Sequence, residues 1–431
     1  MTRLFAVLGP YGVGNIGDAA IVDAMLKNIL KYCPGSVIYG ININPDDTFM
    51  RHSIHSFPLH RNYKKNSDKE GTKEVSERLS NNPTKQLIKK IPFLFVFLKT
   101  AYGLLNSVRL IFLEAGFIIR SYQNIKNFDI LIVNGSGQLC DTWGGPWWHP
   151  YGLFRWGVIA RAASVKFVVM SVGAGPLNSS LSRFFAKHAM KMASYRSFRN
   201  EDSKELVERI GVKGKNLVVP DIAFSLPVVI SREGNTDRNN RPVVGVNPMA
   251  YCDPRTWPES DSEKYATYIG KLSSVVTWLL EKDYKVLLFS SDSMDKNVIK
   301  DVRQLVDEKG YKYEQNQISE AEIWSVTDLL SNISKMEMVI GTRLHSLLLS
   351  ALMFKPLLAL SPHPKVDSLM AGLGLSEYSF DINGFHLEAF QEKFVLLEGK
   401  REKVSEQIKN CIVDYQNKLD KQYQQVFCNH L

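Results

Sequence analysis

Two side chains with anion-binding and acid–base chemistry, Arg343 and His345, stand two positions apart where an apolar stretch ends. Arg343 carries a permanent planar cation that can hold a phosphate or a carboxylate through two hydrogen bonds. His345 titrates near neutral pH and can donate or accept a proton. The pair predicts a site for an anionic substrate. The alternative is an ordinary helix start, with Arg343 in solvent and His345 packed against a neighbour.

The elements around this pair place it at the edge of an α/β sheet. Residues 338–340 form an apolar run typical of a strand, and the apolar pattern of residues 344–352 predicts a helix. Open α/β sheets bind ligands at the carboxyl ends of their strands. The free backbone N–H groups of a helix start, here at Leu344, also attract an anion. The sequence therefore predicts that the helix and the two side chains act on one ligand.

A glycine-rich turn follows the first predicted strand. Residues 4–8 predict a strand, residues 9–18 contain four glycines, and residues 19–31 predict a helix. Glycine allows a tight turn and a close approach of a ligand to the backbone, although the spacing is not that of a dinucleotide-binding fingerprint. Asn15 and Asp18 are expected at the mouth of this turn. The alternative role of Asp18 is to cap the helix.

The ordered set of motifs resembles the polysaccharide pyruvyl transferase family. The motifs are Asn15-Ile-Gly-Asp18, Arg199 with Ser203, Asp221 with Phe224, Arg343-Leu344-His345, and Lys365. The resemblance extends from about residue 5 to about residue 375, with a gap between roughly 50 and 125. It implies a two-domain α/β fold similar to glycosyltransferase-B. It also implies an enzyme that uses phosphoenolpyruvate to place a pyruvate ketal on a sugar.

The resemblance also implies roles for individual residues. The residues expected to hold phosphoenolpyruvate are Arg343, Leu344, His345, Arg199 and Lys365, with His345 as the catalytic acid. The residues expected on the acceptor side are Asn15, Asp18, Asp141 and Trp143, with Asp18 or Asp141 accepting the hydroxyl proton. No metal or redox cofactor is expected, because the phosphoenol already carries the activation.

Several of these roles have plain structural alternatives. Arg199 can pair with nearby Glu201 or Asp202, and Lys365 can be a solvated amine. The aromatic residues that begin at Trp143 can stack on a sugar or simply pack together. Two positions also depart from the family pattern: Ser136 replaces a glycine of the turn before Asp141, and Asn200 stands where an aspartate is usual.

The alternation of strand and helix patterns predicts two Rossmann-like domains. We expect residues 1–230 to form an acceptor domain with a basic and apolar insertion at about 60–120. A polar linker at 231–241 leads to a donor domain at 242–385, and a helical tail at 386–431 is expected to pack back across the junction. Within these domains, residues 218–224 predict a strand and residues 319–331 predict a helix.

Charge and composition limit the partners. The net charge of +9 favours an anionic partner, and no interleaved basic and aromatic pattern indicates nucleic acid. Residues 61–90 are basic and residues 91–119 are apolar, but charges interrupt the apolar run before the roughly 20 residues of a membrane span. Peripheral contact with an anionic membrane through residues 61–119 is one interpretation. Burial within the domain or in an oligomer interface is the other.

The five cysteines are far apart, and no secretion signal is seen. These features predict a cytoplasmic protein. If the protein contacts lipid, it is expected at the inner face of the cytoplasmic membrane. The acceptor sugar stays open, including one carried on undecaprenyl diphosphate. Two other functions stay open as well. One is a nucleotide-sugar glycosyltransferase of the same fold. The other is a non-catalytic, membrane-associated partner in a polysaccharide assembly complex.

Overall fold

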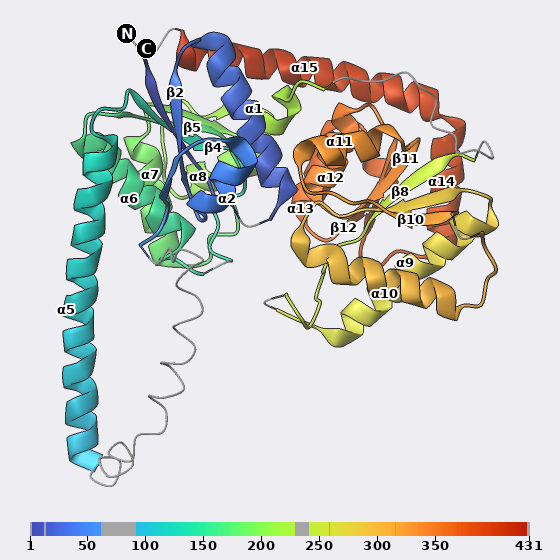
Figure 1. Cartoon of the computed structure of the whole chain (residues 1–431), viewed down its shortest axis with the longest axis horizontal. Helices are drawn as coiled ribbons and strands as arrows, with labels where there is room; N and C mark the ends of the chain where they lie inside the picture. The colour runs from blue at the N-terminus through green and yellow to red at the C-terminus, as the bar shows by residue number, and fades with distance from the viewer. Residues whose placement is uncertain are drawn as a thin grey trace.

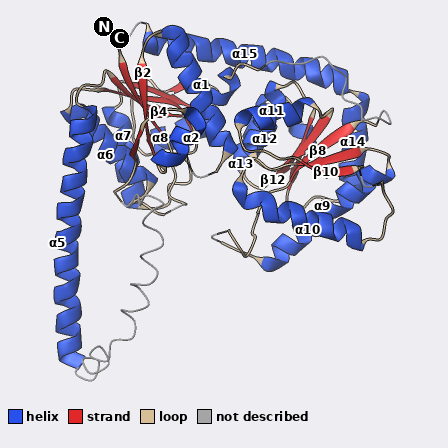
Figure 2. Ribbon diagram, viewed as in Figure 1, coloured by secondary structure: helices blue, strands red, loops and turns tan. Residues whose placement is uncertain are grey.

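Two parallel sheets, each covered by helices, lie side by side in the computed structural model of the chain (Figure 1, Figure 2). The structure describes residues 2–12, 14–61, 92–142, 144–228, 241–257, 259–314 and 316–428, and side chains are not described for 92–107. The prediction of two Rossmann-like units is confirmed by these sheets. The predicted linker at 231–241 lies almost wholly outside the described residues, as does most of the basic run at 61–90.

The first sheet has the strand order β3-β2-β1-β4-β5-β6-β7. Its strands are β1 (Leu4–Leu8), β2 (Val37–Asn42), β3 (Ser56–Pro58), β4 (Ile130–Asn134), β5 (Lys166–Val172), β6 (Tyr195–Phe198) and β7 (Leu217–Val218). The central strands β1 and β4 are mainly apolar because helices cover both faces of the sheet. Chain order reverses between β1 and β4, so the ligand crevice of such a sheet opens at their carboxyl ends.

The helices of this half follow the strands in alternation. They are α1 (Ile16–Tyr32), α2 (Pro45–His52), α5 (Pro92–Ile125), α6 (His149–Ala162), α7 (Ser180–Met192), α8 (Glu201–Arg209) and the 3-10 helix η2 (Ile222–Ser225). Residues 91–119 were expected to form interrupted helices, whereas α5 is continuous to Ile125. In the described part of the chain, no helix has both the length and the apolar character to cross a membrane.

The second sheet has the order β10-β9-β8-β11-β12-β13. Its strands are β8 (Val243–Asn247), β9 (Lys285–Leu288), β10 (Ile318–Glu320), β11 (Met338–Gly341), β12 (Leu357–Ser361) and β13 (Ser379–Asp381). Its helices are α9 (Ser262–Glu281), η3 (Ser293–Asp295), α10 (Lys296–Glu308), α11 (Val326–Ser334), α12 (Leu344–Leu352), α13 (Pro364–Gly372) and η4 (Ser376–Tyr378). The reversal of order lies between β8 and β11, so the second crevice opens where α12 begins.

Two predicted elements are wrong. The strand expected at 218–224 ends at Val218, and Asp221 then caps η2 by accepting a hydrogen bond from Ala223 N. The helix expected at 319–331 is the edge strand β10 followed by α11, which begins only after the capping box of Ser325 and Asp328. In both places a capping side chain starts a new element, and apolar spacing alone does not show it.

The tail forms two helices, α14 (Leu387–Gly399) and α15 (Arg401–Phe427). Helix α15 extends along both halves of the molecule and ends beside the N-terminus (Figure 1). Phe427 near its end packs edge-on against Phe5 of β1, with ring centroids 5.8 Å apart. The predicted packing of the tail across the junction is therefore confirmed.

Candidate active site

The two crevices face each other, and their loops are in direct contact. Helix α1 follows β1, and its residue Ile16 donates a backbone hydrogen bond to Ser291 O of the second half at 2.8 Å. The His345 ring, from the first turn of α12, packs directly against Gly17 of α1. A Cβ atom added at Gly17 would overlap the imidazole. The absence of a side chain at Gly17 thus lets His345 enter the first half of the molecule.

Asp221 joins two of the predicted site residues. Its Oδ2 accepts a hydrogen bond from Arg199 Nη1 at 3.2 Å and lies 3.8 Å from His345 Nε2. Its side chain is 1% exposed. The alternative in which Arg199 pairs with Glu201 or Asp202 is wrong, because the guanidinium turns to Asp221. Gly173 makes room for it, since a Cβ there would lie 2.8 Å from Arg199 Nη2.

The electrostatics of this group keep Asp221 ionised. Burial alone would raise the pKa of Asp221, but His345 and Arg199 outweigh burial and lower the pKa to about 2. His345 Nε2 is buried and has no hydrogen-bond partner in the described protein. It is the ring nitrogen that faces Asp221.

Asp18 lies close enough to His345 for the two groups to interact electrostatically. Ser136, in the turn after β4, donates a hydrogen bond from Oγ to Asp18 Oδ1 at 2.8 Å. Burial raises the pKa of Asp18, and His345 and the Ser136 hydroxyl offset only part of that rise. A carboxylate with a raised pKa binds a proton more readily than an ordinary one, which suits a general base.

Lys365 reaches towards the first half from the start of α13. Its Nζ lies 3.3 Å from the position that a Cβ of Gly137 would take. Its ammonium makes no hydrogen bond or ion pair with a described residue. Burial lowers the pKa of Lys365, and Arg199 lowers it further. An unpaired cation in this position is suited to an anionic ligand.

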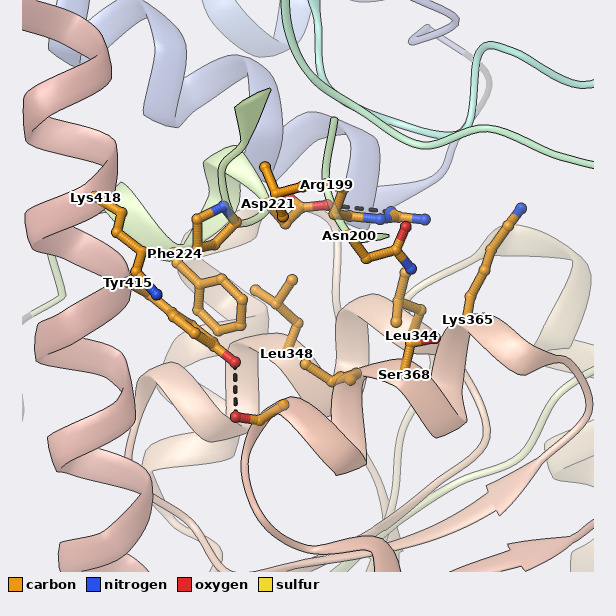
Figure 3. Close-up of a pocket in the computed structure, with 14 residues that line it drawn as sticks. Arg199, Asn200, Asp221, Phe224, Leu344, Leu348, Lys365, Ser368, Tyr415 and Lys418 are labelled. Carbon is orange, nitrogen blue, oxygen red and sulfur yellow. Dashed lines mark hydrogen bonds and ion pairs between the residues drawn. The ribbon is translucent and has the colours of Figure 1, made fainter. Parts of the chain in front are cut away.

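A cavity of about 210 Å³ lies between the two halves and α15. Figure 3 shows Arg199 and Asp221 on one side of it, Leu344 and Leu348 opposite, and Tyr415 of α15 at one end. Tyr415 and Lys418 also line the cavity, and neither was predicted to do so. Their spacing on a distant C-terminal helix predicts packing, and no local signal connects them to a site.

Arg343 lies where the sequence predicts, at the start of α12, but it forms an ion pair that the sequence does not predict. Its guanidinium donates to both oxygens of buried Asp295, from Nε at 2.8 Å and from Nη2 at 2.7 Å. Asp292 lies 3.5 Å from its Nη1. Leu344 is among the described residues that line the cavity, whereas its neighbours Arg343 and His345 are not, and neither is Asp18. The bidentate pair holds the turn between β11 and α12 against η3.

The predicted acceptor residues lie apart from one another. Asn15 caps α1 through Oδ1, and its Nδ2 donates to Asp292 across the junction at 3.3 Å. Asp141 accepts backbone hydrogen bonds from Asn178 and Ser179, and these bonds, outweighing burial, lower its pKa. Trp143 lies outside the described residues. Asp18 is thus the one predicted acceptor residue that the described structure places beside His345.

The two departures from the family pattern have structural explanations. Asn200 caps α8 by accepting a hydrogen bond from Ser203 N at 3.1 Å, and an aspartate could make the same cap. Ser136 has a positive φ of 57°, a conformation that favours glycine. Its hydroxyl bond to Asp18 is a contact that glycine could not make.

Comparisons with known proteins show similarity at two levels. A sequence model described as polysaccharide pyruvyl transferase matches residues 15–364. No curated protein sequence matches the chain. Similar solved structures include a UDP-GlcNAc 2-epimerase from Neisseria meningitidis bound to UDP-GlcNAc, with a TM-score of 0.55 and 14% identity over 98% of this chain and 100% of that one.

Two further structures have the same overall arrangement. A glycosyltransferase from Rickettsia africae has a TM-score of 0.54 and 13% identity, over 99% of each chain. A complex of S. aureus MnaA with UDP has a TM-score of 0.54 and 10% identity, over 94% of this chain and 90% of that one. At these identities the likeness shows the fold alone. It confirms the predicted two-domain architecture similar to glycosyltransferase-B.

Proposed function

Because the chain belongs to the polysaccharide pyruvyl transferase family, we propose that it transfers the pyruvyl group of phosphoenolpyruvate to two hydroxyl groups of one sugar. The products are a cyclic ketal and phosphate. The acceptor is a precursor of a bacterial surface polysaccharide, and a sugar carried on undecaprenyl diphosphate is the specific candidate. The observation that carries the proposal is the meeting of Arg199, Asp221 and His345 where the two halves join.

The donor is assigned to the positive groups around the cavity. Phosphoenolpyruvate carries a phosphate and a carboxylate, and such groups are held best by guanidinium, ammonium and helix N–H donors. Arg199 engages Asp221 through one nitrogen, which leaves its other nitrogens for the donor. Lys365 has no ion-pair partner among the described residues, and Leu344 begins α12 at the cavity wall. Arg343 is assigned to supporting that helix start instead.

The reaction begins with a proton transfer from His345. The imidazolium protonates the methylene carbon of the donor, and the central carbon becomes electrophilic. A sugar hydroxyl attacks this carbon, and its proton passes to Asp18. The bond from the central carbon to the phosphate oxygen then breaks, and its electron pair leaves with phosphate.

A second hydroxyl of the same sugar closes the ketal. Of the two hydroxyl protons, one restores His345 and the other leaves with phosphate, so the enzyme returns to its starting state. Asp221 stabilises the imidazolium before each transfer, because its low pKa keeps it ionised at neutral pH. This scheme uses side chains of the chain itself. In the described residues, no group of three or more His, Cys, Asp or Glu side chains is arranged to hold a metal ion.

The proposal is tested by following the transfer directly. Purified protein is incubated with phosphoenolpyruvate and a series of undecaprenyl-diphosphate sugars, and acceptor mass and phosphate release are measured. His345→Ala should lower turnover by about 100-fold or more, since it removes the general acid. The matched control is His386→Ala, at the exposed start of α14. Equal rates for the two variants would remove His345 from the proposed role.

A thermal-shift comparison separates this proposal from its alternatives. Phosphoenolpyruvate should raise the unfolding temperature of the protein, because a ligand that binds only the folded state stabilises it. A rise with UDP and none with phosphoenolpyruvate would support a nucleotide-sugar glycosyltransferase instead. Absence of a rise with either compound would support a non-catalytic protein.

A further inference from the structure

Helix α5 presents an exposed apolar segment, whose Leu110 O accepts a hydrogen bond from Arg61 Nη1 at 2.8 Å. Residues 108–113 are all exposed, and five of the six are apolar. Phe112 is 73% exposed and Ile111 is 67% exposed. Figure 1 shows α5 extending well beyond the rest of the first half. Apolar patches of this kind mark surfaces that bind a membrane or a partner, because water solvates them poorly.

The following turns fix this segment to the body. Phe117 and Ile125 of α5 are buried, and Phe117 packs edge-on against Trp156 of α6. Glu114 accepts hydrogen bonds from Arg155 Nη1 at 2.6 Å and from Tyr151 at 3.0 Å. Glu114 is the one acidic residue between residues 108 and 125. Its negative charge is compensated by Arg155. The segment therefore presents apolar groups without free negative charge.

The neighbouring helices α6 and α7 extend the same character. Neither contains an Asp or Glu residue. Trp147, Val158 and Phe184 are exposed beside them, at 62%, 42% and 49%. Several cations on α5, α6 and α7, and Lys126 directly after α5, form no ion pair with a described residue. On the helices they are Arg109, Arg120, Arg161, Arg183, Lys187 and Lys191. These helices thus combine exposed apolar groups with uncompensated positive charge.

We propose that α5, α6 and α7 form a docking surface for an anionic lipid bilayer. The apolar side chains of residues 108–113 enter the boundary between headgroups and acyl chains, and the cations bind the anionic headgroups. A second copy of the chain fits less well, because two like-charged surfaces repel each other. The surface is separate from the cavity, so the inference goes beyond the proposed transfer and does not depend on it.

Vesicle sedimentation with the full chain tests the proposal without any activity measurement. The probes are vesicles of phosphatidylcholine alone and of phosphatidylcholine mixed with phosphatidylglycerol. The chain should bind the mixed vesicles about tenfold or more tightly, and high salt should weaken this binding, since the headgroup attraction is electrostatic. Failure of the full chain to bind phosphatidylglycerol vesicles would overturn the proposal.

One pair of variants tests the apolar contribution. Ile111→Asp with Phe112→Asp should weaken vesicle binding by about tenfold or more, because charged groups do not enter the acyl region. The control is Val395→Asp with Val413→Asp, at similarly exposed apolar positions of α14 and α15. All four side chains are exposed, so thermal unfolding should stay unchanged. Equal loss of binding in the control pair would contradict the assignment to α5.

A second pair tests the charges. Arg183→Glu with Lys191→Glu, on α7, should weaken binding by about tenfold or more. Lys403→Glu with Lys421→Glu on α15 makes the same change in net charge and should have a much smaller effect. Light scattering measures self-association in parallel. A dimer that disappears in the Phe112 variant, without vesicle binding by the parent chain, would identify an oligomer interface and overturn the proposal.

Discussion

Ser136 illustrates how one hydroxyl adjusts a neighbouring carboxylate in this site. It adopts a left-handed backbone conformation, which costs a residue with a Cβ roughly 1 kcal/mol. In return its Oγ donates to Asp18, and this bond lowers the pKa of Asp18 against the rise that burial causes. If Asp18 accepts the sugar proton, Ser136 is a positioning residue that keeps more of the carboxylate ionised.

Ser136→Gly should therefore separate activity from stability. Without the donor, the pKa of Asp18 rises further, and the base is ionised only at higher pH. The acidic limb of the turnover–pH profile should then move to higher pH, while the free energy of unfolding changes by less than about 1 kcal/mol. Ser164→Gly is the matched control, because Ser164 has the same positive φ of 57° in the turn after α6, away from the cavity. An acidic limb at the same pH in both variants would contradict the role of Ser136.

Helices α1 and α12 meet at their first turns, where the His345 ring of α12 packs against Gly17 of α1. Gly17→Ala would place a methyl group on the His345 ring, and the rigid junction around it leaves little space for adjustment. We expect a loss of roughly 1–3 kcal/mol in stability and a fall in turnover as His345 moves away from Asp221. Urea unfolding and the transfer assay measure the two effects.

Gly270→Ala supplies the control for this change. Gly270 lies within α9, and a Cβ there would meet no other atom within 4 Å. Alanine in that position should stabilise the protein by up to about 1 kcal/mol, because it favours the helix. Gly17→Ala with unchanged stability and turnover would show that the contact of α1 with α12 does not position His345.

The elements that the sequence predicts best are those that are buried on all sides. Strand β1 is an apolar run of five residues, and its predicted bounds, 4–8, agree with the structure. Edge strand β10 contains Ser319 and Glu320, so its pattern resembles a polar helix surface. Its strand form depends on pairing with β9, which lies more than thirty residues earlier.

The site residues also divide into features that the local sequence predicts and features that depend on tertiary packing. The types of Arg199, His345 and Lys365 can be read from the sequence, and His345 follows the strand predicted at 338–340. The strand before Arg199, β6, was not predicted. The partners of the site residues cannot be read from the sequence, since Asp221 and Asp295 reach them through tertiary packing. Arg343 is the clearest case: its place at the end of β11 was predicted, but its bond to Asp295 depends on where η3 lies.

At the scale of the whole molecule, α15 holds the two halves in register. Tyr415 donates to Gly372 O of the second half at 2.8 Å. Seven residues later, buried Gln422 accepts hydrogen bonds from Tyr195 and Ser197 and donates to Ser171, all in the first sheet. One amide thus satisfies three hydroxyl groups in β5 and β6.

Gln422→Ala should destabilise the contact between α15 and the first sheet by more than the loss of one side chain's packing. The change leaves buried hydroxyl groups without partners, each at a cost of roughly 1–3 kcal/mol, and opens a small cavity. Arg199 and His345 come from opposite halves of the molecule. A looser α15 should therefore also increase the distance between His345 and the Arg199–Asp221 pair and lower turnover. Urea unfolding should show an earlier transition for the first half. The control is Gln424→Ala, at an exposed position of the same helix, which should unfold at the same urea concentration as the parent chain. A Gln422→Ala variant as stable as the parent chain would mean that the contacts between the two halves at Gly17 are enough to hold the site.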